Sequence, residues 1–140
     1  MKTGFPSELF TPEITILSLF SAAFYGRNDV QYIRAAGCEK VMLIDNDKEK
    51  LSKTGSLYGY GSICADVYRL LDLPDFGDPD GFDIVVVDQW SNQDEQIHQV
   101  YINRLMKLAR RYLILSCTEA YLKGERPQGE YYKRSDHLVS

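Results

Sequence analysis

Short apolar runs of strand length recur along the chain and alternate with stretches that have helical spacing. The clearest run, Phe82–Val87, is rich in β-branched residues, and the earlier run Ile14–Phe20 is nearly all apolar. Such runs are typical of strands that are buried on both faces of a sheet. Together with three shorter runs they predict five strands, at residues 14–20, 40–44, 62–65, 82–87 and 112–115.

The segments between these runs predict helices. In the longest of them, apolar residues form one stripe along the helix. Gly37 is placed to cap the first helix at its C-terminus, because glycine accepts the left-handed conformation that such caps need. Gly55 is expected just beyond the end of the second helix. The predicted helices span residues 29–36, 47–52, 67–71 and 94–109, and a further helix is expected to begin within 118–122.

Strand–helix alternation carried five times predicts an α/β fold with three layers, in which a mostly parallel, doubly wound sheet has helices on both faces. A Rossmann-like sheet of this kind binds its ligands in the crevice outside the carboxyl ends of the strands. The 18 residues after Leu122 are enough for at most one extra C-terminal strand. We expect residues 1–140 to form a single domain, with a core at about 14–122 and a polar C-terminal tail at 123–140.

Composition narrows the class of protein. With 140 residues, 44% of them apolar and 26% charged, the chain is typical of a soluble globular domain. No apolar run approaches the roughly 20 residues of a membrane span, and no secretory signal is evident. Because Cys38, Cys64 and Cys117 form no C-x-x-C pair, we expect neither disulfides nor zinc, and a reducing, cytoplasmic environment. His98 and His137 lack metal-ligand spacing, so no metal is expected.

Charge is distributed unevenly along the chain. Residues 1–103 carry 8 Lys or Arg against 16 Asp or Glu, whereas residues 104–140 carry 8 against 4. The basic segment is either a solvated face or a contact for an anionic partner such as nucleic acid. The overall net charge of −4 argues against strong non-specific binding to duplex DNA, because that binding depends on phosphate neutralisation.

Three aspartates follow three successive predicted strands. Asp45, Asp66 and Asp88 are separated by 21 and 22 residues, about one strand–helix unit each, so all three are expected at the same edge of the sheet. A carboxylate at the end of the second strand can accept both hydroxyls of a ribose. Each aspartate can equally cap the helix that follows it. Three in register favour a nucleoside site.

These residues resemble the cofactor site of class I S-adenosylmethionine-dependent methyltransferases, over roughly residues 14–122. The resemblance implies the strand order 3-2-1-4-5 and S-adenosylmethionine as cofactor. It places ribose at Asp45 with Asn46, adenine at Asp66 with Val67, and the transferred methyl group at Asp88. It implies catalytic residues at Asp88, Gln89 and Trp90. The turn after the first strand would hold the methionine part of the cofactor, through Phe20, Ser21, Ala22, Ala23, Tyr25 and Gly26.

The first turn departs from the family pattern. Ser21-Ala22-Ala23 stands where glycines are usual, and Ser18 stands where an acid is usual. Leu19-Phe20 followed by small residues resembles the cytosine-C5 DNA methyltransferases, but the nucleophilic cysteine of those enzymes is missing after the fourth strand. The Asp/Asn-Pro-Pro-aromatic motif of amino-methylating DNA enzymes is also missing. Trp90 could stack on a flat substrate or close the core at a strand end.

Two functions follow from these residues. The first is a methyltransferase whose acceptor is unknown, with nucleic acid slightly favoured, and whose substrate site is completed by a partner subunit or a second copy. The second is an inactive methyltransferase-like module used for binding or assembly. A nicotinamide dehydrogenase has the same fold but needs G-x-G-x-x-G after the first strand, and of those glycines only Gly26 is present.

Overall fold

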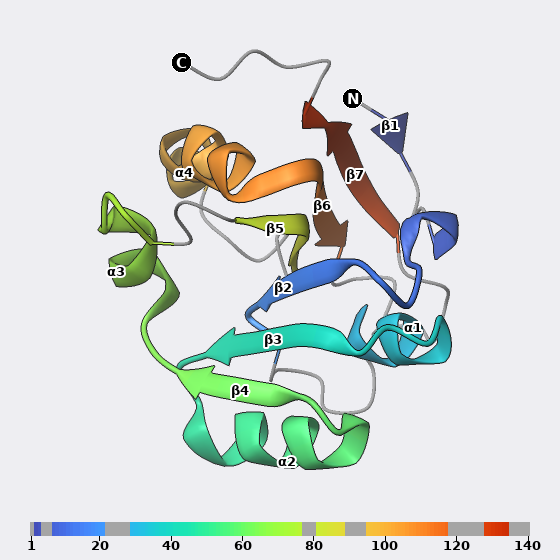
Figure 1. The fold of residues 1–140 in the computed structure, drawn as a ribbon. Coiled ribbons are helices and arrows are strands. Elements are labelled where there is room, and N and C mark those ends of the chain that lie inside the picture. The colour runs from blue at the N-terminus through green and yellow to red at the C-terminus, as the bar shows by residue number, and fades with distance from the viewer. Residues whose placement is uncertain are drawn as a thin grey trace.

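A computed structural model describes residues 2–3, 7–21, 29–76, 81–88, 95–117 and 128–134 (Figure 1). The described strands are β1 (Lys2–Thr3), β2 (Thr15–Leu19), β3 (Lys40–Asp45), β4 (Gly61–Cys64), β5 (Phe82–Val87), β6 (Ala109–Cys117) and β7 (Gln128–Lys133). The described helices are the short 3-10 helix η1 (Ser7–Leu9) and the α-helices α1 (Asp29–Ala35), α2 (Lys48–Tyr58), α3 (Val67–Asp72) and α4 (Glu95–Leu108).

The described strands form one sheet in the order β1-β7-β6-β5-β2-β3-β4. Strands β4, β3, β2, β5 and β6 are parallel to one another, while β7 pairs antiparallel with β6. The five parallel strands therefore have the predicted order 3-2-1-4-5, and β7 is the one extra C-terminal strand. The two-residue β1, which pairs antiparallel with β7, was not predicted.

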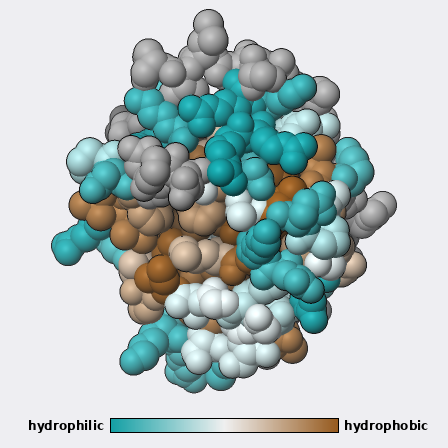
Figure 2. All heavy atoms as spheres, in the orientation of Figure 1, coloured by the Kyte–Doolittle hydropathy of each residue, from teal (hydrophilic) through white to brown (hydrophobic). Residues whose placement is uncertain are grey.

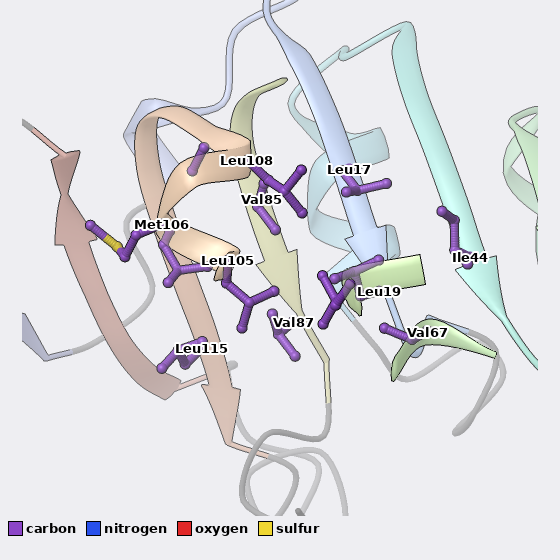
Figure 3. Packing of buried hydrophobic residues seen from close by; sticks show 13 residues of the cluster. Leu17, Leu19, Ile44, Val67, Val85, Val87, Leu105, Met106, Leu108 and Leu115 are labelled. Carbon is purple, nitrogen blue, oxygen red and sulfur yellow. The ribbon is translucent and has the colours of Figure 1, made fainter. Parts of the chain in front are cut away.

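The helices lie on both faces of this sheet, as predicted. Side chains of α1 and α2 pack with Ile16, Leu43 and Ile84 on one face. On the other face, α3 and α4 cover Leu17, Leu19 and their neighbours (Figure 3). Successive residues of a strand point to opposite faces, so each buried strand supplies both clusters. The result is the expected three-layer α/β architecture.

The second helix is longer than predicted. We expected it to end near Ser52, with Gly55 beyond it, whereas α2 continues to Tyr58. Gly55 lies inside the helix, where a Cβ atom would come within 3.0 Å of the Tyr60 carbonyl oxygen. Gly59, at φ 76°, provides the left-handed C-cap instead, and its N–H donates to the Gly55 carbonyl. Close packing of the helix against the next strand, rather than chain reversal, accounts for the first glycine.

The other boundaries differ by smaller amounts. Gly37 has the expected left-handed conformation, at φ 83°, just after α1. Ala109, predicted as the last residue of the long helix, begins β6, which is also longer than the predicted strand at 112–115. The helix predicted to begin within 118–122 lies outside the described residues. Within the described part of the chain, no helix is both long and apolar enough to cross a membrane.

At the amino ends of the strands, an ion pair with hydrogen bonds connects β2, β5 and β6. Asp83 Oδ2 accepts a hydrogen bond of 2.9 Å from the Thr15 N–H, and the Asp83 N–H donates to Thr15 Oγ1 at 3.0 Å. Arg110 Nη2 lies 3.2 Å from Asp83 Oδ1. We call this group, Thr15, Asp83 and Arg110, the amino-edge network. It fixes the relative positions of three strands at the edge opposite to the predicted site.

Candidate functional site

The carboxyl ends of the parallel strands meet at one edge of the sheet. Leu19 of β2 pairs with Ile44 of β3 and with Val87 of β5, so the next residue of each strand stands at one common level. Main-chain hydrogen bonds of 2.9 Å continue the pairing there, from Phe20 N–H to the Ile44 carbonyl and from Asp88 N–H to the Leu19 carbonyl. The residues at this level are Cys64, Asp45, Phe20, Asp88 and Ser116, in the order of their strands.

Buried polar groups are concentrated at this edge. Of the six polar or charged residues that are buried in the described part of the chain, five lie at the carboxyl ends of β2, β3, β5 and β6. The sixth, Thr54, belongs to α2 and donates a hydrogen bond to the Lys50 carbonyl of the same helix. Burial of polar groups is costly unless they are hydrogen-bonded, so such a concentration marks a built polar site. The five are Ser18, Ser21, Asp45, Asp88 and Ser116.

Asp45 ends β3, and only 7% of the residue is exposed. Its Oδ1 accepts a hydrogen bond of 2.7 Å from the Asn46 N–H. The N-cap of the following helix is Asp47, whose Oδ1 accepts from the Lys50 N–H at 3.0 Å. Asp45 is therefore not a helix cap, and that alternative is excluded for the residue predicted to hold ribose. The neighbouring Asn46 is exposed.

Asp66 caps the helix that follows it, which is the second of the two roles predicted for these aspartates. It is the N-cap of α3, and its Oδ1 accepts hydrogen bonds from the N–H groups of Tyr68 and Arg69 at 3.0 and 3.4 Å. Its side chain is about half exposed, with Oδ2 at 3.9 Å from Arg69 Nε. Val67 is buried in the core that α3 shares with the sheet. A role of Asp66 toward adenine stays a prediction, beside a capping role that accounts for its position.

Asp88 ends β5 and is 1% exposed. Its Oδ2 accepts a hydrogen bond of 3.2 Å from Ser18 Oγ on the adjacent strand β2. It cannot cap α4, which begins seven residues later at Glu95. Ser18 and Asp88 are thus joined inside the protein at the position where the order of the strands reverses. Ligands of doubly wound sheets bind outside this position.

The first turn is held by hydroxyl groups and has a strained residue. Phe20 has φ 59°, a left-handed conformation that costs a non-glycine residue about 1–2 kcal/mol. Ser21 Oγ donates to the Ser18 carbonyl at 3.4 Å and so closes the turn around Phe20. The family usually has glycines in this turn, where left-handed residues are accepted without strain. The described part of the turn therefore adopts a glycine-like conformation without a glycine.

Three aromatic rings form a row from this turn across the adjacent helices. The Phe20 ring centroid lies 5.6 Å from that of Tyr68 in α3, which lies 5.3 Å from that of Tyr101 in α4. Burial raises the pKa of Tyr68, and Tyr101 and Asp66 raise it further. Burial also raises the pKa of Tyr101, as do Asp72, which accepts a hydrogen bond from its hydroxyl, and Asp66. Both phenols therefore stay neutral at physiological pH.

The aromatic row was missed from the sequence. Tyr68 lies only two residues after Asp66, but nothing in the linear pattern brings Phe20 beside it. The predicted site residues Ala22, Ala23, Tyr25, Gly26, Gln89 and Trp90 lie outside the described residues. No group of three or more His, Cys, Asp or Glu side chains that could hold a metal ion occurs among the residues that are described.

Some exposed side chains on the elements around the sheet are apolar. Three large apolar residues are between 45% and 51% exposed: Leu57 on α2, Ile63 on β4, and Leu73 just after α3. In Figure 2, hydrophobic atoms gather on the side of the molecule where α3 and the carboxyl ends of β3 and β4 lie. Binding sites for flat organic ligands are lined mainly by apolar and aromatic groups with a few polar ones. The edge has both kinds of group.

Comparison with solved structures identifies the fold. PKMT2 from Rickettsia typhi, in complex with AdoHcy, is similar over 81% of this chain, with 15% identity and a TM-score of 0.54. A putative methyltransferase from Haloferax volcanii, in complex with the Trm112 methyltransferase activator, is similar over 82%, with 12% identity and a TM-score of 0.55. A putative Zn-dependent alcohol dehydrogenase from Rhodobacter sphaeroides is similar over 79%, with 12% identity and a TM-score of 0.58.

The chain spans 25%, 53% and 45% of the length of these three proteins, respectively. No protein-family model matches the sequence, and no curated protein is similar to it. The matching structures also include an O-methyltransferase from Bacillus cereus. The described sheet has the strand order 3-2-1-4-5 that the resemblance implies, with one antiparallel strand beside the fifth. The chain therefore has the fold of the class I S-adenosylmethionine-dependent methyltransferases.

Proposed function

We propose that this chain is an S-adenosylmethionine-dependent methyltransferase, built as a single Rossmann-like domain with its core at about 14–122. The observation that supports this most directly is Asp45, an acid at the end of β3 that is nearly buried and does not cap a helix. A carboxylate in this place is suited to accept two ribose hydroxyls. Asp45 would hold ribose with Asn46 beside it, Asp66 and Val67 would lie at the adenine, and the turn from Phe20 to Gly26 would hold the methionine part.

The described residues fit such a cofactor. Polar groups are buried at the carboxyl edge, and a row of aromatic rings begins at the same turn. When bound, S-adenosylmethionine supplies a methyl group that is activated by its positive sulfur. The protein then has to align the acceptor with the bond to that methyl group and exclude water, since positioning dominates such transfers. Asp88, Gln89 and Trp90 are the residues proposed to face the acceptor.

Electrostatics favour this cofactor over a dinucleotide. Asp45 and Asp88 are the formally charged residues that are buried in the described part of the chain, and both are acidic. They stand on β3 and β5, on either side of β2, so a ligand over the end of β2 lies near both. A pyrophosphate would be repelled by two carboxylates in a poorly screened environment, whereas a sulfonium or ammonium would be attracted. This electrostatic preference and the lack of the G-x-G-x-x-G motif both argue against a dinucleotide.

Nucleic acid is the slightly favoured acceptor in this proposal, because of the basic C-terminal segment. The structure assigns several of these cations to other contacts. Arg104 donates to the carbonyls of Leu71 and Leu73 at the end of α3, and Arg134 donates to the Lys107 and Ala109 carbonyls. The charge asymmetry is thus partly structural, and it gives only weak support to an anionic acceptor.

A second copy or a partner subunit could complete the acceptor site, as part of the same proposal. The Haloferax volcanii methyltransferase is in a complex with an activator protein. The competing function is an inactive module that keeps the fold for binding or assembly. The feature that favours the module is the strained first turn, in which Phe20 has a conformation that glycine would adopt without strain.

Binding of S-adenosylhomocysteine tests the proposal. We expect this ligand to raise the melting temperature of the protein and to give a saturable signal in calorimetry. Asp45→Asn should reduce the rise, because the amide offers one acceptor oxygen instead of two charged ones. Asp83→Asn is the matched control, since it changes an aspartate at the opposite edge of the same sheet. An unchanged melting temperature of the wild-type protein at millimolar ligand would contradict the proposal.

The same site can be followed by cysteine labelling. Cys64 is exposed and pairs with Asp45 in the sheet, whereas Cys38 is buried. Bound S-adenosylhomocysteine should slow the reaction of Cys64 with a thiol reagent, measured in a Cys117→Ser variant. NAD should not slow it. Ligand binding without methylation of any nucleic-acid, protein or small-molecule acceptor would favour the inactive module.

A further inference from the structure

Strand β4 forms the end of the sheet opposite to β1, and its outer side faces no other described strand (Figure 1). All four of its residues, Gly61–Cys64, are exposed, including Ile63 at 45%. Helix α2 packs against one face of the sheet through Leu51 and its neighbours, and the exposure of β4 shows that this helix does not cover the edge. An open sheet edge offers main-chain donors and acceptors to another strand.

The hydrogen bonds between β4 and β3 fix which main-chain groups of β4 point outward. The Ala65 N–H donates to the Asp45 carbonyl of β3 at 2.9 Å. Main-chain groups of successive residues alternate between the two sides of a strand, so those of Ile63 also point toward β3. Those of Ser62 and Cys64 point to the outer side. The outer edge therefore presents a donor and an acceptor at each of positions 62 and 64, on either side of Ile63.

The side chains of β4 alternate between the two faces of the sheet. Ile63 pairs with Ile44, so its side chain lies on the face that α3 and α4 cover. Ser62 lies beside Gly55 of α2, on the opposite face. A second copy that pairs antiparallel across a two-fold axis keeps the faces matched, so each residue can only meet a residue of its own face. The register that brings the apolar side chain to the axis sets Ile63 opposite its own copy.

This register suits both the main chain and the charges of the edge. Ser62 stands opposite Cys64 of the second copy, and the two exchange their N–H···O=C hydrogen bonds on either side of the Ile63 pair. Residues 54–65 carry no charged side chain, although 26% of the chain is charged, so self-pairing sets no like charges opposite each other. β4 also contains neither the lysine nor the proline that commonly protects an open edge.

We propose that β4 is a self-association edge, at which two copies of this chain join their sheets by antiparallel pairing of Gly61–Cys64 about Ile63. Stable interfaces bury about 800 Å² on each partner, and a strand of four residues provides less. The dimer is therefore weak, and it forms at roughly tens to hundreds of micromolar protein. The inference is independent of the proposed function. It also differs from a second copy at the acceptor site, because β3 and β2 separate β4 from β5.

Sedimentation velocity at increasing protein concentration tests the self-association. The wild-type protein should shift from monomer toward dimer over this range. Ile63→Lys should weaken the dimer by about tenfold or more, because it sets two like charges directly opposite each other. Leu73→Lys is the matched control, since Leu73 is 48% exposed and lies after α3, and it should leave the dimer unchanged. A wild-type protein that stays monomeric at millimolar concentration would overturn the proposal, as would equal weakening by the two lysines.

Cysteine cross-linking tests the register, at a concentration at which the wild-type protein is dimeric. In a Cys64→Ser/Cys117→Ser background, Ile63→Cys should form an intermolecular disulfide on mild oxidation, since the Cα atoms of such an opposite pair lie about 4.5 Å apart. Ser62→Cys in the same background should not, because its two copies are offset by two residues, about 7 Å along the strands. Cys38, which is buried, stays in both variants. Equal cross-linking of the two variants, or of neither, would overturn this pairing.

Discussion

Strand β5 carries one aspartate near each of its ends, and the two have different surroundings. At the amino edge, Asp83 forms an ion pair with Arg110 and hydrogen bonds with Thr15. The side chain of Asp83 is 22% exposed, and that of Arg110 is 44% exposed. At the carboxyl edge, Asp88 is 1% exposed and accepts the hydroxyl of Ser18. The first arrangement neutralises the acid where it stands. The second keeps an acid inside the protein beside a polar edge.

The difference predicts that the two ends of one strand serve stability and ligand binding separately. The amino edge also contains Tyr60, whose hydroxyl donates to the Cys38 carbonyl at 2.7 Å, and Gly81, which approaches the end of α4. These contacts join neighbouring elements and satisfy their main-chain groups. The carboxyl edge instead gathers acids, hydroxyls and a strained turn, which are costly features that ligand sites commonly keep. Changes at the two edges should therefore have different consequences.

The largest effect on stability is expected at Gly81, at the amino edge. Gly81 has φ 58°, and a Cβ atom there would come within 2.9 Å of the Leu108 carbonyl oxygen. Gly81→Ala should lower the free energy of unfolding by about 2 kcal/mol or more, because it combines backbone strain with a clash against main chain. Gly61→Ala is the control, since nothing lies within 4 Å of a Cβ atom there. Urea unfolding measures both, and equal midpoints would contradict this account of Gly81.

Replacing one aspartate at each edge by asparagine should give two different phenotypes. Asp83→Asn should lower the free energy of unfolding by about 1 kcal/mol through its contacts with Arg110 and Thr15, and leave ligand affinity unchanged. Asp45→Asn should cost about tenfold or more in S-adenosylhomocysteine affinity and little stability. Thermal unfolding with and without ligand gives both quantities. If both variants lose stability alone, the two edges do not differ in role.

In the first turn, a glycine variant should be more stable than an alanine variant, which is the reverse of their usual order. Phe20→Ala and Phe20→Gly both remove the ring contact with Tyr68, but only glycine also relieves the strain at φ 59°. Phe20→Gly should therefore be more stable than Phe20→Ala by about 1 kcal/mol. Denaturant unfolding of the two variants, compared directly, cancels the loss of the ring. A more stable alanine variant would show that the left-handed turn is not maintained.

The last effect is absent at neutral pH, because it is a pH dependence from the amino edge that is confined to alkaline conditions. Burial raises the pKa of Tyr60 to about 12 from its ordinary value of 10.0, with Cys38 adding to the rise. Since the folded state holds this proton more tightly, its stabilisation is complete below pH 10 and is lost as the pH rises from there toward about 12. Tyr60→Phe should make this decline shallower in chemical denaturation at several pH values. An unchanged slope would assign the decline to other groups.

The fold could be predicted from the sequence because each buried strand carries its own signal. Phe82–Val87 and Lys40–Asp45 were found at or within one residue of their bounds, since apolar runs between turn residues leave few alternatives. The end of α2 was placed wrongly, because a glycine gives the same local signal whether it ends a helix or permits close packing. Only the approach of Gly55 to the Tyr60 carbonyl decides between the two.

The sequence by itself determined which acids stand at the ends of the strands, because strand and helix periodicities fix chain direction and spacing. It could not decide what each acid does. Asp66 caps α3 while Asp45 leaves that task to Asp47, and Asp88 turns toward Ser18, which is 70 residues away in the chain. Such distinctions depend on strand register and on which neighbours exclude water. Only the tertiary structure sets these, because hydrogen bonding and burial join residues that the linear order keeps apart.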